Sequence, residues 1–329
     1  MSGALRNYAE QALHYYRREH TSVPRQPLQG RSAWRGHELQ ESESWLETLN
    51  AEELAELERA GRSSADLPVE TLRREDVPLP TLSRRIASWR DELSQGRGFL
   101  VIRGLPVSRW GDALSARAYW ALGLHLGVPG AQNPTGEHLG HVTDYGEDAS
   151  QPFVRRYRTA GDIAYHCDLA DVVGLLCLRT GRTGGRSRIA SSVAVYNALL
   201  DARPDLVDRL FEPMKLDLRG EGGGSGRRWL PVTPCCHAEG VLRTFYHSDY
   251  FRSVVRHDDV APFTRQEQEL FDTYEALAES PELRLEMQFQ QGDIQLLSNH
   301  FVLHARAAYE DGADAGERRH LLRLWLSLH

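Results

Sequence analysis

The chain has 329 residues, a net charge of −7 and 41% hydrophobic residues. This apolar content is enough for one large core, and a single β-rich domain with additions fits the length. Nucleic-acid-binding proteins usually carry a basic surplus, so the acidic balance argues against nucleic acid as a partner.

The N-terminal residues 1–7 lack the apolar core of a signal peptide, and no stretch approaches the roughly 18 apolar residues of a membrane span. None of the four cysteines belongs to a C-x-x-C pair, so we expect reduced thiols in the cytoplasm and no thiolate zinc site. The expected partner is a small-molecule substrate, and neither nucleic acid nor a membrane is expected as a partner. A homodimer is a possible oligomeric state.

The first part of the chain is polar, and apolar groups recur at helical spacing in 45–49 and 54–57. We predict a helical N-terminal extension over 1–75 and one further domain over 76–329. Within that domain, helices are expected at 82–93 and 113–126, with a buried strand at 98–104 between them.

After Gly130, short apolar runs alternate with turn residues, which predicts an antiparallel sandwich or barrel. Two helices are expected among these strands, at 193–200 and at 265–278, the second capped by Thr264. The glycine-rich stretch 219–228 lacks the spacing of a phosphate-binding loop, so a surface loop is the favoured interpretation. The predicted strands are 172–178, 188–193, 241–247, 283–289, 294–298 and 319–328.

A His-x-Asp pattern can aim an imidazole and a carboxylate at one metal ion, because residues i and i+2 of a strand lie on one face about 6.6 Å apart. With a distant histidine it forms the facial triad of non-haem iron oxygenases, which leaves three positions open. His304 is the favoured distant histidine, with His300 and His320 as alternatives. Spacing alone does not choose among the three pairs, which are His166–Asp168, His247–Asp249 and His257–Asp259.

The segment 318–326 is predicted to be a strand with Arg319, Leu321 and Arg323 on one face. Guanidinium groups on an apolar strand are costly unless anions pair with them. A dicarboxylate cosubstrate bound in a bidentate manner would supply one such anion. Pairing with protein acids such as Asp311 or Glu317 is the alternative.

At these residues the chain resembles the taurine dioxygenase (TauD/TfdA-like) family of Fe(II)- and 2-oxoglutarate-dependent oxygenases. The resemblance covers about residues 95–329 and implies a mainly β (α+β) protein with flanking helices around a double-stranded β-helix (jelly-roll, cupin-like) core. The matching segments follow one another as 96–99, 103–106, 165–168 with 171–176, 184–187, 292–294, 303–306 and 318–325.

The resemblance selects His166 and Asp168, because only this pair is followed by an apolar strand, a Gly-Gly turn and a hydroxyl residue. Together with His304, they would bind Fe(II). Ser187 matches the hydroxyl residue that contacts the distal carboxylate of 2-oxoglutarate, and Arg319 matches the arginine that pairs with it. Arg323 matches a second arginine, which we group with Ser187 and Arg319 as a cosubstrate-binding candidate and which in relatives often binds an anionic group of the substrate.

The resemblance also implies the reaction. O₂ and 2-oxoglutarate would be converted with release of succinate and CO₂, while an unactivated C–H bond of a small anionic or amino-acid-like metabolite is oxidised, most simply by hydroxylation. An intact Asp168 favours this over halogenation. Desaturase, cyclase and epimerase outcomes, a cupin-like metal hydrolase or isomerase, and a non-catalytic binding protein are the alternatives.

Polar residues near the motifs are the candidates for substrate binding. Strand alternation also predicts that Cys167, which stands where relatives carry threonine, points away from the metal. The substrate-binding candidates are Gln132, Asn133, Tyr157, Arg158, Tyr165, Asp171 and Arg323.

Overall fold

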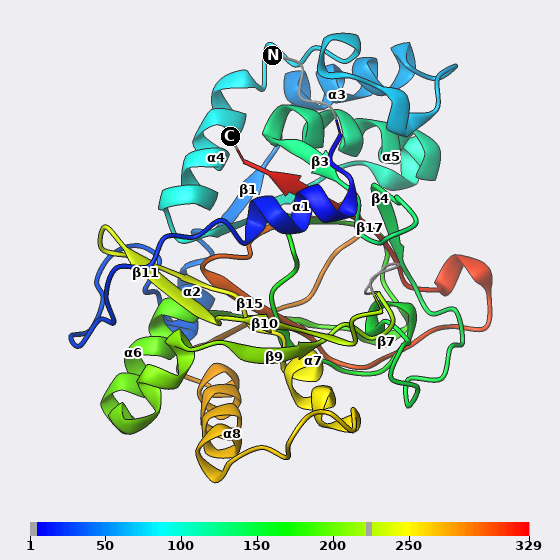
Figure 1. Cartoon of the computed structure of the whole chain (residues 1–329). Coiled ribbons are helices and arrows are strands. Elements are labelled where there is room, and N and C mark those ends of the chain that lie inside the picture. The colour runs from blue at the N-terminus through cyan, green and yellow to red at the C-terminus, as the bar shows by residue number, and fades with distance from the viewer. Residues whose placement is uncertain (1–4, 222–225, 329) are drawn as a thin grey trace.

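Two β-sheets face each other, and helices cover the outer face of each sheet (Figure 1). The computed structural model describes residues 5–221 and 226–328. The centre of the glycine-rich stretch, 222–225, therefore lies outside the described residues, and its prediction as a surface loop is not addressed.

The larger sheet has seven strands in the order β1-β2-β14-β6-β17-β3, with β4 also paired to β17. Its central strands β6 and β14 are buried along most of their length because helices cover one face and the smaller sheet covers the other, which suits their continuous apolar sequences. The strands are β1 (Leu46–Thr48), β2 (Phe99–Arg103), β3 (Val128–Gly130), β4 (Leu139–Val142), β6 (Val172–Arg179), β14 (Ile294–Ser298) and β17 (His320–Ser327).

The smaller sheet has four antiparallel strands in the order β13-β8-β15-β5. They are β5 (Ile163–His166), β8 (Ser187–Ser191), β13 (Arg284–Met287) and β15 (Val302–Arg306). Three short two-stranded sheets complete the strands: β9 (Met214–Asp217) with β10 (Trp229–Val232), β11 (Cys235–Ala238) with β12 (Val241–Thr244), and β7 (Thr183–Gly184) with β16 (Tyr309–Glu310).

The helices form two outer layers. On the larger sheet, α4 (Ser83–Gln95) and α5 (Val107–Leu126) pack directly and α3 (Ala51–Ser63) packs on α5, whereas α6 (Ser192–Ala202) and α8 (Arg265–Glu279) cover the smaller sheet. The predicted cap at Thr264 is confirmed, since its side chain accepts from Glu267 N–H in a capping box. The remaining α-helices are α1 (Tyr8–Tyr15), α2 (Gly36–Ser42) and α7 (Ser248–Ser253).

The helical prediction for residues 45–49 is wrong, because this segment forms β1, which pairs in parallel with β2. The Trp45 carbonyl already accepts from Val101 N–H at 3.0 Å, and the Trp45 ring is buried in the core between the sheets. Pairing with a strand more than 50 residues away thus overrides the local apolar periodicity.

Other parts of the segment 1–75 also contact the two sheets. Gln11 of α1 is fully buried and accepts from Ser327 Oγ of β17 at 2.9 Å, and Tyr15 belongs to the apolar core under the smaller sheet. The division of the chain at residue 75 stays a prediction.

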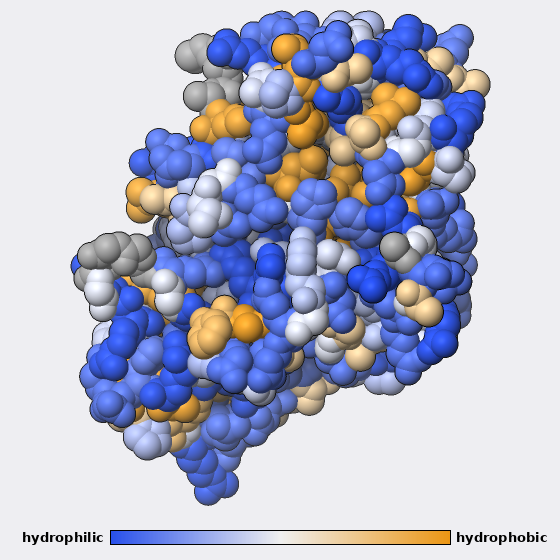
Figure 2. Space-filling model, turned by 90° about the vertical axis from the view of Figure 1, so that its right-hand side faces the viewer, coloured by the Kyte–Doolittle hydropathy of each residue, from blue (hydrophilic) through white to orange (hydrophobic). Residues whose placement is uncertain are grey.

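The surface turned to the viewer in Figure 2 is mostly hydrophilic, with hydrophobic residues gathered in its upper half. Among the described residues, no helix combines the length and the apolar character needed to cross a membrane.

Candidate metal centre

His166, Asp168 and His304 meet at one end of the space between the two sheets. In the antiparallel pair β5–β15, His304 lies directly opposite His166, and Asp168 follows two residues after the end of β5. Asp168 Oδ1 lies 3.9 Å from His166 Nε2, and Asp168 Oδ2 lies 3.9 Å from His304 Nε2. One candidate ligand atom from each residue lies within 4.8 Å of the other two, so one ion could contact all three.

Hydrogen bonds orient these groups toward a shared point. His166 Nδ1–H donates to the Ala164 carbonyl at 2.9 Å, which leaves the Nε2 lone pair for a metal. The Trp325 indole N–H donates to Asp168 Oδ2 at 2.9 Å, and the Asp168 backbone N–H donates to Asn299 Oδ1 at 2.9 Å. Such outer contacts hold metal ligands in position before an ion binds.

The protonation states suit a divalent cation. Burial alone would raise the pKa of Asp168, but nearby Arg323, His304 and His166 lower it below its ordinary value. Burial, reinforced by His166, lowers the pKa of His304 to about 3. An ionised carboxylate and neutral imidazoles are the forms that bind metal, and two nitrogens with one oxygen suit Fe(II).

The structure does not assemble a comparable site around the second His-x-Asp pair. The His247 ring stacks on Tyr250 with centroids 3.9 Å apart and lies 5.0 Å from the His166 ring. Asp249 instead lies 3.4 Å from Arg156 Nε.

The remaining alternatives are also engaged elsewhere. His257 contacts Asp217 at 3.0 Å, and Asp259 accepts from Arg228 and Trp229. The two alternative distant histidines, His300 and His320, contact Asp171 and His141 respectively, each at 2.8 Å.

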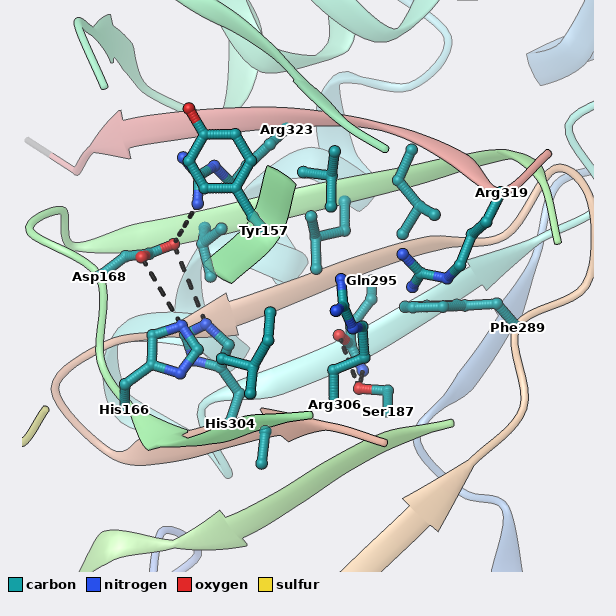
Figure 3. A pocket seen from close by; sticks show the side chains of 16 residues that line it. Tyr157, His166, Asp168, Ser187, Phe289, Gln295, His304, Arg306, Arg319 and Arg323 are labelled. Atoms are coloured by element: carbon teal, nitrogen blue, oxygen red, sulfur yellow. Dashed lines mark hydrogen bonds and ion pairs between the residues drawn. The ribbon is translucent and has the colours of Figure 1, made fainter. Parts of the chain in front are cut away.

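A cavity runs between the sheets from the triad to Arg319 (Figure 3). Ser187 and Gln295 lie along it and contact each other, with Gln295 Nε2 3.1 Å from Ser187 Oγ. The apolar part of the lining comprises Val142, Ile163, Val173, Leu175, Phe289, Ala305 and Leu321.

Arg319 lies at the end of this cavity away from the triad and is 5% exposed. Its Nη1 is buried without a hydrogen-bond partner among the described residues, and its guanidinium lies 5.1 Å from the centroid of the Tyr309 ring. Asp311, one of the alternative acid partners, accepts from the Arg319 backbone N–H at 2.7 Å, and no described ion pair joins it to the guanidinium. The guanidinium is therefore available to an anion in the cavity.

Arg323, which lies within β17, is instead part of the metal centre. Its Nη1 lies 3.7 Å from Asp168 Oδ2, and its Nε donates to Gln132 Oε1 at 2.6 Å. The guanidinium also lies over the Tyr157 ring, 4.4 Å from the centroid. Of these two candidates for substrate binding, Tyr157 lines the cavity, whereas Gln132 is fully buried and contacts Arg323 without lining it.

The structure does not bring four other candidates to this cavity. Asn133 donates to Glu137, Arg158 pairs with Glu147, and Asp171 contacts both His14 and His300. Tyr165 precedes His166 on β5, so strand alternation directs it to the opposite apolar core. By the same alternation Cys167 points away from the triad, with its thiol near the Thr244 and Val302 carbonyls.

Arg306 and Gln295 also line the cavity, although no sequence pattern indicated a role for either residue. A second hollow, which no sequence pattern indicated, is lined by Asp168 and lies next to the metal centre. There Arg155 pairs with Glu221 through two contacts of 2.5 Å, and Tyr8 donates to the same carboxylate at 2.8 Å. No local pattern joins Tyr8 to Glu221, which are 213 positions apart.

The profile of the taurine catabolism dioxygenase TauD, TfdA family matches residues 63–325. The chain belongs to the TauD, TfdA family. It is therefore an oxidoreductase of the non-haem iron, 2-oxoglutarate-dependent oxygenases, and its cofactors are Fe(II) and 2-oxoglutarate.

Two relatives match over most of their length. FR-33289 synthase of Streptomyces rubellomurinus is 30% identical over 320 residues, covering 93% of this chain and 92% of that protein. The taurine hydroxylase-like protein SAT17 of Stachybotrys chartarum is 26% identical over 315 residues, covering 90% of this chain and 79% of that protein.

Solved structures confirm the predicted jelly-roll fold. Asparagine oxygenase, in complex with Fe(II), 3-hydroxyasparagine and succinate, superposes with a TM-score of 0.67 at 19% identity, covering 86% of this chain and 93% of that one. The non-haem iron oxygenase OrfP, in complex with Fe and α-ketoglutaric acid, gives a TM-score of 0.60 at 14% identity, covering 85% of this chain and 93% of that one.

Proposed function

We propose that this TauD, TfdA family member hydroxylates an unactivated C–H bond of a small anionic or amino-acid-like metabolite, with release of succinate and CO₂. In this proposal His166, Asp168 and His304 hold Fe(II), and Ser187 and Arg319 bind the distal carboxylate of 2-oxoglutarate. The observation that carries it is one cavity with a buried two-histidine, one-carboxylate centre at one end and a guanidinium that lacks an acidic partner at the other.

The free Arg319 Nη1 favours an oxygenase over the alternatives from other classes. A metal hydrolase or isomerase needs the triad but has no use for a buried cation deep in the same cavity. Burying a guanidinium without an anion destabilises the fold. The buried Arg319 guanidinium therefore indicates a ligand that places a carboxylate beside it. A non-catalytic binding protein would need neither end of the cavity.

Each part of the site has a distinct role in the proposed reaction. Bound iron supplies the activation of O₂ that the oxidation requires. The apolar walls exclude water, and Arg319 with Ser187 fixes the far end of 2-oxoglutarate. Trp325 and Asn299 keep Asp168 directed at the metal through their hydrogen bonds.

Charged groups near the triad support an anionic or zwitterionic substrate. Arg323 lies beside Asp168. The second hollow presents both charges, since Arg155 there is paired with Glu221, and Tyr8 and Tyr250 add polar aromatic surface. The solved relatives carry hydroxylated asparagine or hydroxylated arginine in their complexes, which agrees with an amino-acid-like compound.

The proposal is tested by measuring conversion of 2-oxoglutarate to succinate with and without Fe(II) and O₂, in the presence of panels of amino acids, sulfonates and other small anions. Conversion should require both Fe(II) and O₂ and should be stimulated by an anionic or zwitterionic compound. Asp168→Ala should abolish it. Asp249→Ala, in the rejected His-x-Asp pair, should retain Fe(II) binding. The reverse behaviour of the two variants would contradict the proposed metal ligands.

A further inference from the structure

Arg306 occupies the cavity between the metal centre and Arg319 (Figure 3). It ends β15, two residues after His304, and is 6% exposed. Its Nη2 donates to the carbonyls of Thr159 at 2.7 Å and Gly161 at 2.5 Å. Its Nε and Nη1 are buried without hydrogen-bond partners among the described residues.

No acidic side chain of the described residues lies within ion-pair distance of Arg306. Asp162 follows Gly161 in the loop that Arg306 contacts, but its carboxylate lies 3.7 Å from Arg188 instead. Another cation is close, because Arg306 and Arg319 both pack against Tyr309, at 4.8 and 5.1 Å from its ring centroid. Two buried guanidiniums that share one aromatic neighbour repel each other unless an anion lies between them.

We propose that Arg306 and Arg319 together bind the distal carboxylate of 2-oxoglutarate, with the Ser187 hydroxyl as a third donor. This rests on the proposed function, because it specifies how the cosubstrate of that reaction is held. A carboxylate has two oxygens with several lone pairs, so it can accept from the free N–H groups of both arginines and from a hydroxyl.

The position along β15 suits such a ligand. His304 and Arg306 are two residues apart on one strand, which separates them by about 6.6 Å. An extended five-carbon dicarboxylate is of comparable length, so one of its ends can lie at the triad while the other reaches the arginines. A monocarboxylate 2-oxo acid without the distal group would gain nothing from Arg306.

Arg306 could instead act only as a tether, since its Nη2 holds the loop at Thr159 and Gly161. The two roles differ in ligand selectivity. A tether affects the binding of every ligand that reaches the triad, whereas a carboxylate clamp affects only ligands that carry the distal carboxylate. Comparing 2-oxoglutarate with 2-oxobutyrate separates the two roles.

The test uses the full chain loaded anaerobically with Fe(II), titrated calorimetrically with each acid. In Arg306→Gln, the Kd for 2-oxoglutarate should rise about ten- to hundredfold, as expected for loss of a charged hydrogen bond, while the Kd for 2-oxobutyrate stays unchanged. Arg186→Gln is the matched control, because Arg186 is 60% exposed, pairs with Glu286 and does not line the cavity. This control should bind both acids with the Kd values of the wild-type protein.

Equal weakening of both acids in Arg306→Gln, or no weakening of either, would overturn the inference. If Arg306→Gln does not fold, Arg306→Lys keeps the charge with a single donor group. Arg306→Lys should weaken 2-oxoglutarate binding selectively, and a Kd equal to that of the wild-type protein would again overturn the inference. Failure of the iron-loaded wild-type protein to bind 2-oxoglutarate would refute the proposed function itself, and with it this inference.

Discussion

Replacing Trp325 with phenylalanine should weaken metal binding while leaving the fold intact. The indole N–H donates to Asp168 Oδ2 at 2.9 Å, and both side chains are buried, so no water replaces the lost donor easily. A hydrogen bond to a charged group contributes about 1.5–3 kcal/mol. At about 1.4 kcal/mol per tenfold change, the Kd for Fe(II) should rise by roughly ten- to a hundredfold.

The assay is an anaerobic titration of the metal-free protein with Fe(II), or with Mn(II) as a redox-stable substitute. Trp34→Phe is the matched control, because the Trp34 indole also donates a hydrogen bond from a buried ring, at 2.8 Å to the Arg97 carbonyl, but does not line the cavity. The control should bind metal normally. An unchanged Kd in Trp325→Phe, with the control behaving alike, would refute the claim that this contact orients Asp168.

Three further outcomes follow from the same contacts. Ser187→Ala should raise the Kd for 2-oxoglutarate about two- to tenfold in calorimetry, because one neutral donor is lost; an unchanged Kd would remove Ser187 from the site. His320 has its pKa lowered to about 4 by burial and then by His141 and Arg179, so the unfolded chain binds a proton between pH 6.5 and 4 that the folded chain does not. Stability should therefore fall by up to about 1.4 kcal/mol per pH unit as the pH drops through this window, and urea unfolding of His320→Gln should show a shallower slope. Asp293→Asn should lower the free energy of unfolding by about 1.5–3 kcal/mol, because it removes the negative charge and one of the two oxygens that accept from Arg103 at 2.9 and 3.0 Å; a urea midpoint equal to that of the wild-type protein would contradict this.

The residues of the triad could be predicted because a short local pattern offered the candidates and the resemblance to the TauD/TfdA-like family selected among them. His166 and Asp168 belong to one short pattern, and the apolar strand, Gly-Gly turn and Ser187 that follow distinguish it from the other two pairs. Arg319 could be predicted because an arginine next to an apolar strand calls for an anion, and the resemblance assigned that anion to the cosubstrate. The structure places all of these along one cavity.

Other features depend on contacts between distant parts of the chain and have no local signal. Trp45 lies in a stretch with helical periodicity but extends a sheet through Val101. Tyr8 reaches the second hollow because α1 packs across the end of β17, where Gln11 meets Ser327.

Arg306 is a further case, because its motif was visible in the sequence but its role was not. Whether a buried arginine is paired or free is decided by the surrounding loops, and only the structure shows that Nε and Nη1 have no partner among the described residues. The candidates Asn133 and Asp171 illustrate the opposite outcome, since both are occupied by neighbouring side chains.

The most direct test of the central claim is an anaerobic crystal structure of the protein with Fe(II) and 2-oxoglutarate. The account predicts iron bonded to His166 Nε2, Asp168 and His304 Nε2, with the distal carboxylate of 2-oxoglutarate against Arg319 and Ser187. Iron at His247 and Asp249, or a distal carboxylate that does not contact Arg319, would contradict it.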